Sequence, residues 1–290
     1  MIPRILLVGC GKFGRHHLRV LKKLENDKKI ILSGVVTKTA ESSKRIAETD
    51  NVNTYTSLSK KILEEVDGVI IATPVTSHFE ITKQCLEHAS VFVEKPLALK
   101  LEEINELERL SEKFKHKVMV GHIYRFNNAL MELKERISGI PEITIRFTGG
   151  TRSEDTGVLF EYMHVFDILD ILLGTVPINV QCKQVHFTGK IEDHVHLEMD
   201  YPNAKASVIL SWIYETKERT IRIRTADEDI FCDLVSQNIS NMHYMDKEPL
   251  ELELECFVNI YSDDRIKYPD ITIAKKIGNI FKMAYDSLIA

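Results

Sequence analysis

Residues 4–24 read Arg-Ile-Leu-Leu-Val-Gly-Cys-Gly-Lys-Phe-Gly-Arg-His-His-Leu-Arg-Val-Leu-Lys-Lys-Leu, and this stretch decides the fold class. Residues 5–8 form a continuous apolar run, which is typical of a parallel strand covered on both faces. Gly9, Gly11 and Gly14 follow in the spacing G-x-G-x-x-G, before leucines that recur on one helical stripe. The first glycine allows a tight turn, the second a close approach of pyrophosphate, and the third close packing of helix on strand. The pattern predicts a dinucleotide site at a helix N-terminus, and the alternative is a glycine-rich turn that binds nothing.

The rest of residues 1–121 alternates between strand and helix patterns. We expect further strands at residues 30–36, 54–55, 69–72, 91–93 and 118–120, and helices at residues 41–47, 58–65, 78–88 and 101–114. This alternation predicts a Rossmann domain, a doubly wound parallel sheet, over residues 1–121.

From residue 122 the pattern changes to alternating strands separated by short turns. We expect helices at residues 127–137, within 157–174 and at 271–288, and strands at residues 142–148, 180–188, 194–201, 204–213, 220–225 and 229–234. Residues 122–290 are therefore predicted to form an α+β domain with a largely antiparallel, open sheet, and its final helix can pack back near the domain junction. An open apolar sheet face would favour a homodimer or homotetramer through this sheet.

The composition excludes several classes of partner. The net charge of −5 argues against nucleic acid and against an anionic membrane, both of which need a basic face. No apolar run approaches the roughly 20 residues of a membrane helix, and the first apolar run ends in the glycine turn, so we expect no signal peptide. The 5 cysteines are scattered without a C-x-x-C pair, which favours reduced thiols and a cytoplasmic location.

The end of the second predicted strand indicates which nicotinamide cofactor is used. An acidic residue there would bind the ribose 2′-hydroxyl of NAD, whereas this chain has Thr37 followed by Lys38. A hydroxyl and an ammonium group can bind a 2′-phosphate, so we expect NADP to be accepted, in preference to NAD. The alternative is that Lys38 extends into solvent and the pocket does not discriminate.

Taken together, the motifs resemble those of the glucose-fructose oxidoreductase and inositol dehydrogenase family, called Gfo/Idh/MocA, over nearly the whole chain. The resemblance rests on the glycine turn with His17 just inside the following helix, Ala72-Thr73-Pro74 with His78, Glu94-Lys95-Pro96, Gly121-His122-Ile123-Tyr124-Arg125-Phe126, and the helix that carries His164. In family structures the peptide bond before the proline of Glu94-Lys95-Pro96 can be cis.

The resemblance implies an NAD(P)-dependent dehydrogenase or reductase that acts on a secondary hydroxyl or ketone of a sugar, cyclitol or nucleotide-sugar. It implies cofactor contacts from Gly9, Gly11, Lys12, Phe13, Gly14, Thr37, Lys38, Ala72, Thr73, Pro74, His78, Glu94 and Lys95. Two alternatives remain open, namely a glycosidase of the same fold that uses the cofactor transiently and a non-catalytic, cofactor-sensing regulator. Retention of both Lys95 and His164 argues against the regulator.

Two residues are expected to carry the chemistry. Lys95, at the sheet edge over the nicotinamide, can stabilise an alkoxide that develops on the substrate. A histidine side chain titrates near neutral pH, so His164 can take the proton of the hydroxyl. The structural alternatives are a solvated lysine before a turn and a histidine satisfied within a helix–sheet interface.

The acid that would orient His164 differs from the family pattern. Many family members have an aspartate four residues before the histidine, where this chain has Phe160, and the acid here is Glu161. On one continuous helix Glu161 and His164 would share a face. Tyr124, Arg125 and Asn127 are expected to contact substrate, and Arg125 could equally form a salt bridge at the domain junction.

Two further features have structural explanations. His194 and His196 face the same side of a strand, but no cluster of carboxylates or cysteines accompanies them at metal-site spacing, so we expect no metal. Trp212, the single tryptophan, is expected to pack in a core or interface.

Overall fold

The structure is a computed structural model, and it describes residues 2–137, 139–150, 152–153, 155–240, 242–244 and 247–289. It divides into two compact units, of which the first comprises Met1–His122 with Leu250–Lys275 and the second Ile123–Pro249 with Lys276–Ala290. Residues 250–275 thus return to the first unit, a feature that the sequence pattern did not reveal.

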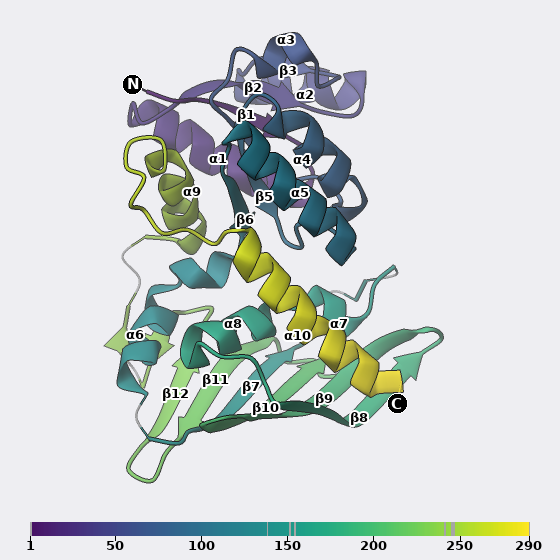
Figure 1. The fold of residues 1–290 in the computed structure, drawn as a ribbon, viewed down its shortest axis with the longest axis vertical. Helices are drawn as coiled ribbons and strands as arrows, with labels where there is room; N and C mark the ends of the chain where they lie inside the picture. The colour runs from purple at the N-terminus through teal and green to yellow at the C-terminus, as the bar shows by residue number, and fades with distance from the viewer. Residues whose placement is uncertain are drawn as a thin grey trace. The chain divides into compact units, whose positions relative to one another are not determined.

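The first unit contains a six-stranded parallel sheet in the order β3-β2-β1-β4-β5-β6 (Figure 1). Its strands are β1 Arg4–Val8, β2 Ile31–Val36, β3 Thr54–Tyr55, β4 Gly68–Ile71, β5 Ser90–Glu94 and β6 Val118–Gly121. The chain runs outward from β1 to β3 and then returns to β4 on the other side of β1. This order confirms the doubly wound sheet and puts its switch point between β1 and β4, where ligands bind in such folds.

The first unit also contains helices, most of which connect the strands of this sheet. They are α1 Lys12–Asn26, α2 Ala40–Asp50, α3 Lys60–Leu63, the 3-10 turn η1 Val75–Ser77, α4 His78–Leu86, α5 Leu101–Phe114, α9 Pro249–Asn259 and the start of α10 Ile271–Ile289. Leu18, Leu21 and Leu24 form the buried stripe of α1, as the leucine spacing predicts.

Helix α9 forms from a sequence whose period is that of a strand. Residues 250–255 alternate leucine with glutamate, yet both residue types are strong helix formers. Leu250, Leu254 and Phe257 share one helical face and are buried. Glu251 pairs with Lys23 of α1 at 2.6 Å, so the helix is tied to the first unit by charge as well as by burial.

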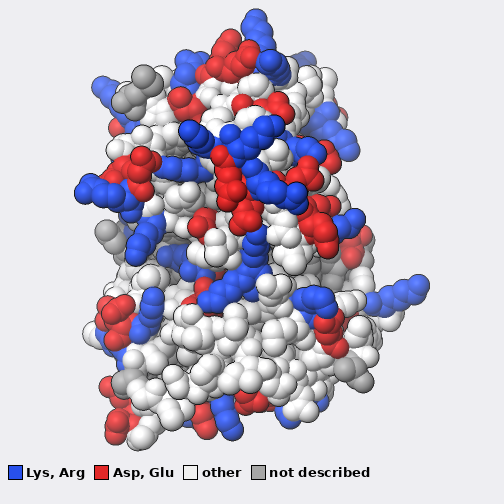
Figure 2. Space-filling view, in the orientation of Figure 1, with Lys and Arg blue, Asp and Glu red and all other residues white. Residues whose placement is uncertain are grey.

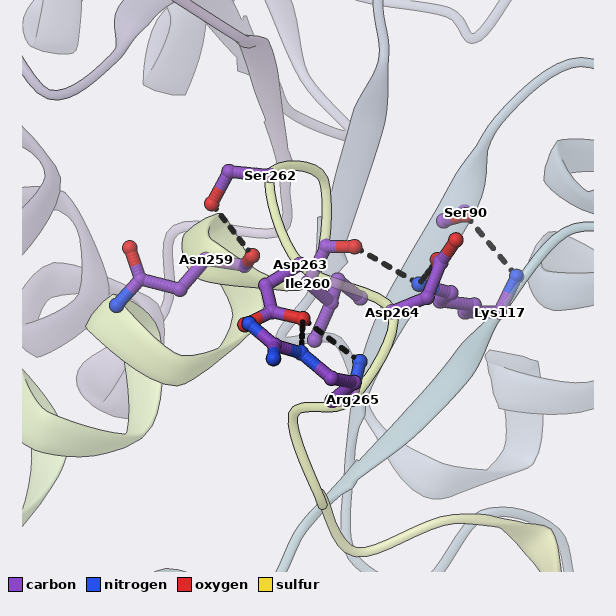
Figure 3. A network of polar contacts seen from close by, with 8 residues as sticks. All are labelled: Ser90, Lys117, Asn259, Ile260, Ser262, Asp263, Asp264 and Arg265. Atoms are coloured by element: carbon purple, nitrogen blue, oxygen red, sulfur yellow. Dashed lines mark hydrogen bonds and ion pairs between the residues drawn. The ribbon is translucent and has the colours of Figure 1, made fainter.

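The segment after α9 covers the edge of the parallel sheet (Figure 3). The Lys117 ammonium, just before β6, donates to the Ile260 carbonyl at 2.8 Å and to the Asp264 carboxylate at 2.7 Å. Farther along β6, the N–H of Val120 donates to the Pro269 carbonyl at 2.8 Å. The bond from Val120 satisfies a backbone donor that an edge strand would otherwise expose, and the Lys117 bonds attach the segment beside it.

The second unit contains an eight-stranded sheet in the order β14-β13-β12-β11-β7-β10-β9-β8. Its strands are β7 Glu142–Thr148, β8 Asn179–Thr188, β9 Ile191–Tyr201, β10 Ala204–Ser211, β11 Glu218–Arg224, β12 Asp229–Asp233, β13 Asn238–Ile239 and β14 Met242–His243. The pair β7–β10 is parallel and the other pairs are antiparallel. The sheet is therefore largely antiparallel, as predicted, but β7 lies between β10 and β11 and interrupts the expected meander.

Helices lie on one face of this sheet (Figure 1). They are α6 Asn128–Arg136, which follows the 3-10 turn η2 Ile123–Phe126, then α7 Val158–Glu161, α8 His164–Leu173 and the later part of α10. Along β7, Ile143, Ile145 and Phe147 are buried on the helix side, whereas Thr144 and Arg146 alternate with them. No helix among the described residues covers the opposite face, which is open as expected. It is polar rather than apolar.

Basic and acidic side chains are interspersed on the face drawn in Figure 2. Some of these opposite charges pair between neighbouring helices, such as Lys83 of α4 with Glu106 of α5 at 2.6 Å. Across the described part of the chain, no helix has the length and apolarity needed to cross a bilayer.

Candidate active site

The first unit has a cavity of about 750 Å³ at the carboxyl ends of β1, β2 and β4. It lies at the switch point of the sheet. Among the residues expected to bind cofactor, those that line it are Gly9, Gly11, Lys12, Phe13, Thr37, Lys38, Ala72, Thr73 and Pro74. Gly14, His78, Glu94 and Lys95 do not line this cavity.

The three glycines differ in what surrounds them. Gly9 has a φ of +93°, and a Cβ there would lie 2.6 Å from the Ala72 carbonyl oxygen. A Cβ on Gly14 would overlap the Gly9 carbonyl oxygen, so this glycine permits α1 to pack against the turn. A Cβ on Gly11 would meet no described atom within 4 Å. The space in front of Gly11 fits a pyrophosphate at the helix N-terminus.

The β2 end of the cavity is cationic. Lys38 and Arg45 lie at this end, Lys12 of α1 also lines the cavity, and no aspartate or glutamate is among the described lining residues. Arg45, in the second turn of α2, was not predicted as a site residue. Its position in the helix that follows β2 could have indicated that it lies near the cofactor ribose. Thr37 is nearly buried, and its hydroxyl donates to the Thr39 carbonyl at 3.1 Å, so toward a ligand it can only accept.

Two buried histidines hold the turns at the sheet edge. His17 is fully buried, and its Nε2 lies 2.6 Å from the Glu94 carboxylate, at the start of Glu94-Lys95-Pro96. The ring of His78 lies 2.8 Å from the Pro96 carbonyl oxygen and 2.9 Å from that of Thr73. We therefore assign His78 a bridging role between the two turns in place of the expected cofactor contact. The Lys95–Pro96 peptide bond is cis.

His164 is the first residue of α8, and Glu161 is the last residue of α7. The prediction that both lie on one helix is wrong, because the chain turns at Tyr162 and Met163 between the two helices. Glu161 is exposed. The two residues therefore belong to different helices, α7 and α8.

Tyr124 is the neighbour that packs on His164. The two rings meet edge to face with centroids 5.2 Å apart, and Tyr124 also contacts Phe147 at 5.7 Å. Burial raises the pKa of Tyr124 to about 12. At neutral pH the phenol is therefore protonated and can donate a hydrogen bond to a ligand.

Arg125 and Asn127 are engaged within the second unit. The Arg125 guanidinium pairs with Asp167 at 2.7 Å and Asp170 at 2.5 Å, both on α8. Asn127 is buried, accepts from the N–H of Leu130 at 3.0 Å and donates to the Leu234 carbonyl at 3.1 Å. These contacts give Arg125 a role in fixing η2 to α8, and Asn127 a role as the cap of α6. Neither arrangement supports the expected substrate contact.

Comparison with known proteins adds the family. Residues 3–122 match GFO_IDH_MocA, an oxidoreductase family with an NAD-binding Rossmann fold. The chain is 25% identical to UDP-N-acetylglucosamine 3-dehydrogenase of Acidithiobacillus ferrooxidans over 243 residues, which cover 82% of this chain and 76% of that protein.

Solved structures agree on the fold across both units. A structure of the same Acidithiobacillus enzyme, GnnA, matches with a TM-score of 0.89 at 21% identity, over 99% of this chain and 98% of that one. The WlbA dehydrogenase of Bordetella pertussis, solved with NADH and UDP-GlcNAcA, matches with a TM-score of 0.84 at 18% identity, over 99% and 96% of the two chains. The glycine turn at the switch point thus lies in the part of the chain, residues 3–122, that matches the Gfo/Idh/MocA family of NAD-binding oxidoreductases, and the solved dehydrogenases share the fold of both units.

Proposed function

We propose that the protein is an NAD(P)-dependent dehydrogenase or reductase that acts on a secondary hydroxyl or ketone of a sugar, cyclitol or nucleotide-sugar. The observation that carries the proposal is the cavity at the switch point, whose Gly11 leaves room for a pyrophosphate. The relatives named for UDP-sugars favour a nucleotide-sugar among these substrates. When bound, the nicotinamide supplies or accepts the hydride.

The chain's own residues would manage the proton and the developing charge. The Lys95 ammonium follows the end of β5 and would donate to the substrate oxygen, which stabilises negative charge on that oxygen. The neutral His164 ring would accept the hydroxyl proton in oxidation and return it in reduction. Tyr124, protonated beside His164, would help to orient the same hydroxyl.

Turnover tests this assignment. Sugars, inositols and nucleotide-sugars are screened while the absorbance of reduced nicotinamide is followed, since a net change separates a dehydrogenase from a glycosidase that uses the cofactor transiently. Lys95→Ala should lower kcat by a factor of roughly 100 or more, because it removes about 3 kcal/mol of transition-state stabilisation. His164→Asn should lower kcat by a factor of roughly 100 and flatten its dependence on pH.

Lys60→Ala, at an exposed lysine of α3, is the matched control and should leave kcat unchanged. A His164→Asn enzyme with normal kcat and an unaltered pH profile would remove the histidine from the mechanism.

We further propose that the cofactor pocket favours NADP. Lys38 and Arg45 both line the cavity near the end of β2 and the start of α2, and the described lining residues include no aspartate or glutamate that would repel a 2′-phosphate. Each charge-assisted contact is worth about 1.5–3 kcal/mol, or at least tenfold in affinity. Thr37 adds little, because its hydroxyl proton is donated to Thr39.

The two reduced cofactors, titrated against the purified protein, decide the preference. Wild type should bind NADPH at least tenfold more tightly than NADH. Arg45→Ala and Lys38→Ala should each weaken NADPH binding by roughly tenfold and leave NADH binding nearly unchanged. Lys44→Ala, on the same helix but outside the cavity, should alter neither. Tighter binding of NADH by wild type at moderate salt would refute the preference.

A further inference from the structure

Arg219 lies on β11, on the helix-covered side of the second sheet opposite Phe147 of β7. Its guanidinium lies against two aromatic rings that also contact each other, with Cζ 5.0 Å from the centroid of Phe147 and 4.4 Å from that of Tyr162. Nη1 donates to the carbonyl oxygens of Thr148 at 2.7 Å and Glu218 at 2.6 Å. The side chain is therefore fixed in place before any ligand arrives.

No carboxylate neutralises this charge among the described residues. The other arginines of the second unit do have one: Arg125 pairs with Asp167 and Asp170, Arg136 with Glu132, Arg146 with Glu218, Arg152 with Asp193, and Arg222 and Arg224 with Asp229. Even Glu218, the chain neighbour of Arg219, gives its carboxylate to Arg146 at 2.7 Å. Within the described part of the chain, Arg219 is thus a fixed cation whose charge is not balanced by a neighbouring carboxylate.

The free edge of the guanidinium has the geometry that oxyanions require. Because Nη1 takes the two carbonyl contacts, Nε and Nη2 keep three N–H donors with no hydrogen-bond acceptor in the described part of the chain. This edge binds a carboxylate or phosphate through two parallel hydrogen bonds. Gly150 borders it, with a φ of +101°, and a Cβ there would lie 3.7 Å from Nη2. A glycine at this position keeps space open beside the guanidinium.

The aromatic rings that hold Arg219 also connect it to His164, the proposed general base. The Phe147 ring that packs on Arg219 also contacts Tyr124, and Tyr124 packs on His164. The positive charge of Arg219 is near enough to Tyr124 to oppose part of the rise in its pKa that burial causes. Arg219, Tyr124 and His164 therefore lie along one side of the second unit.

We propose that Arg219 binds an anionic group of the substrate, so that the substrate is a sugar that carries a carboxylate or a phosphate. The inference rests on the proposed function for the reaction, but the binding of the anion does not depend on turnover. The competing explanation is that Arg219 only ties β11 to the Phe147–Tyr162 pair, in which case its loss would lower stability without any change in ligand preference.

Calorimetric titration of the full-length protein, saturated with NADP, tests the proposal. The probes are glucose, glucuronate, glucose 6-phosphate and UDP-glucose, which separate a neutral sugar, a carboxylate, a phosphomonoester and a diphosphate. Wild type should bind at least one acidic probe tenfold to a hundredfold more tightly than glucose. Arg219→Gln should abolish that difference and leave the affinity for glucose unchanged. The acidic probe with the largest gain identifies the source of the oxyanion.

Arg222→Gln on the same strand is the matched control, because Arg222 is already paired with Asp229, and it should keep the wild-type preference. Arg219→Lys retains the charge without the planar fork and should keep only part of the gain, which decides the case if Arg219→Gln fails to fold. The inference is overturned if wild type binds no acidic probe more tightly than glucose, or if folded Arg219→Gln keeps the preference. An Arg219-dependent preference without any nicotinamide turnover would refute the proposed reaction alone.

Discussion

At the scale of single residues, one motif combines two different constraints. Gly9 and Gly14 are required by the protein's own atoms, because a Cβ at either position would meet backbone oxygen at an impossible distance. Gly11 faces open space, so only a bound ligand can require its lack of a side chain. The surroundings of the three glycines thus agree with the separate tasks that the motif predicts, two in folding and one in binding.

Alanine substitutions should resolve these two constraints. Gly14→Ala should lower the free energy of unfolding by about 1–3 kcal/mol, since the turn or α1 must shift. Gly11→Ala should leave the thermal midpoint of the free protein nearly unchanged and weaken dinucleotide binding by tenfold or more. The measurements are thermal unfolding and cofactor titration. If the Gly11→Ala protein binds the cofactor as tightly as wild type, the pyrophosphate does not bind at this turn and the assignment is wrong.

At the scale of elements, β9 combines burial with titratable side chains. His194 is nearly buried on the open side of the sheet, its ring lies 5.9 Å from that of Tyr214, and His196, His186 and Asp193 are its charged or titratable neighbours. Desolvation, with a smaller effect from His196, lowers the pKa of His194 below its ordinary value. The folded protein therefore holds this ring neutral in a range where the unfolded chain would protonate it.

Stability should consequently fall with acidification. Because the folded pKa is lowered, the unfolded chain binds more protons below about pH 6.5, and the stabilisation is lost as the pH falls from there through the folded pKa. Denaturant unfolding at a series of pH values should show this decline in wild type, and His194→Gln should reduce it. His243→Gln, at an exposed histidine of β14, is the control. An unchanged slope in His194→Gln would contradict the assignment.

At the scale of the whole molecule, the open face of the second sheet bears on assembly. Arg146, His196 and Glu198 point to this side, while Ile209 of β10 supplies a partly exposed apolar centre between the partner positions Arg146 and His196. This face is more polar than an obligate interface usually is. We keep the proposal of a homo-oligomer through this sheet, now with a salt-sensitive contact.

Sedimentation velocity measures the assembly directly. Wild type should sediment as a dimer or larger species that dissociates partly as salt is raised, because screening weakens polar contacts. Ile209→Lys should give monomers, since it buries an unpaired charge at the centre of the interface. Ile140→Lys, at an exposed residue before β7, should behave as wild type. A wild-type monomer at all concentrations would end the proposal.

The sequence by itself determined the Rossmann sheet, the strand–glycine turn–helix order and the resemblance to the Gfo/Idh/MocA family that the match of residues 3–122 supports. These features depend on the period of apolar residues, on turn residues and on motif spacing, all of which are set by residues close together in the chain. It also predicted most strands of the second sheet from their alternation.

Only the tertiary structure decided the rest, because each remaining feature depends on atoms far apart in the chain. The Leu-Glu repeat became helix α9 because Leu250 and Leu254 share one face that is buried in the first unit. The helix before His164 broke at Tyr162, whose hydroxyl donates to the Gly149 carbonyl at 2.6 Å and accepts from the Trp212 indole at 3.0 Å. Arg125 pairs with two carboxylates, whereas Arg219 has no carboxylate partner among the residues that the structure describes, although both are simply arginines in the sequence. The sequence shows which side chains are charged, but only the folded structure determines which group pairs with each charge.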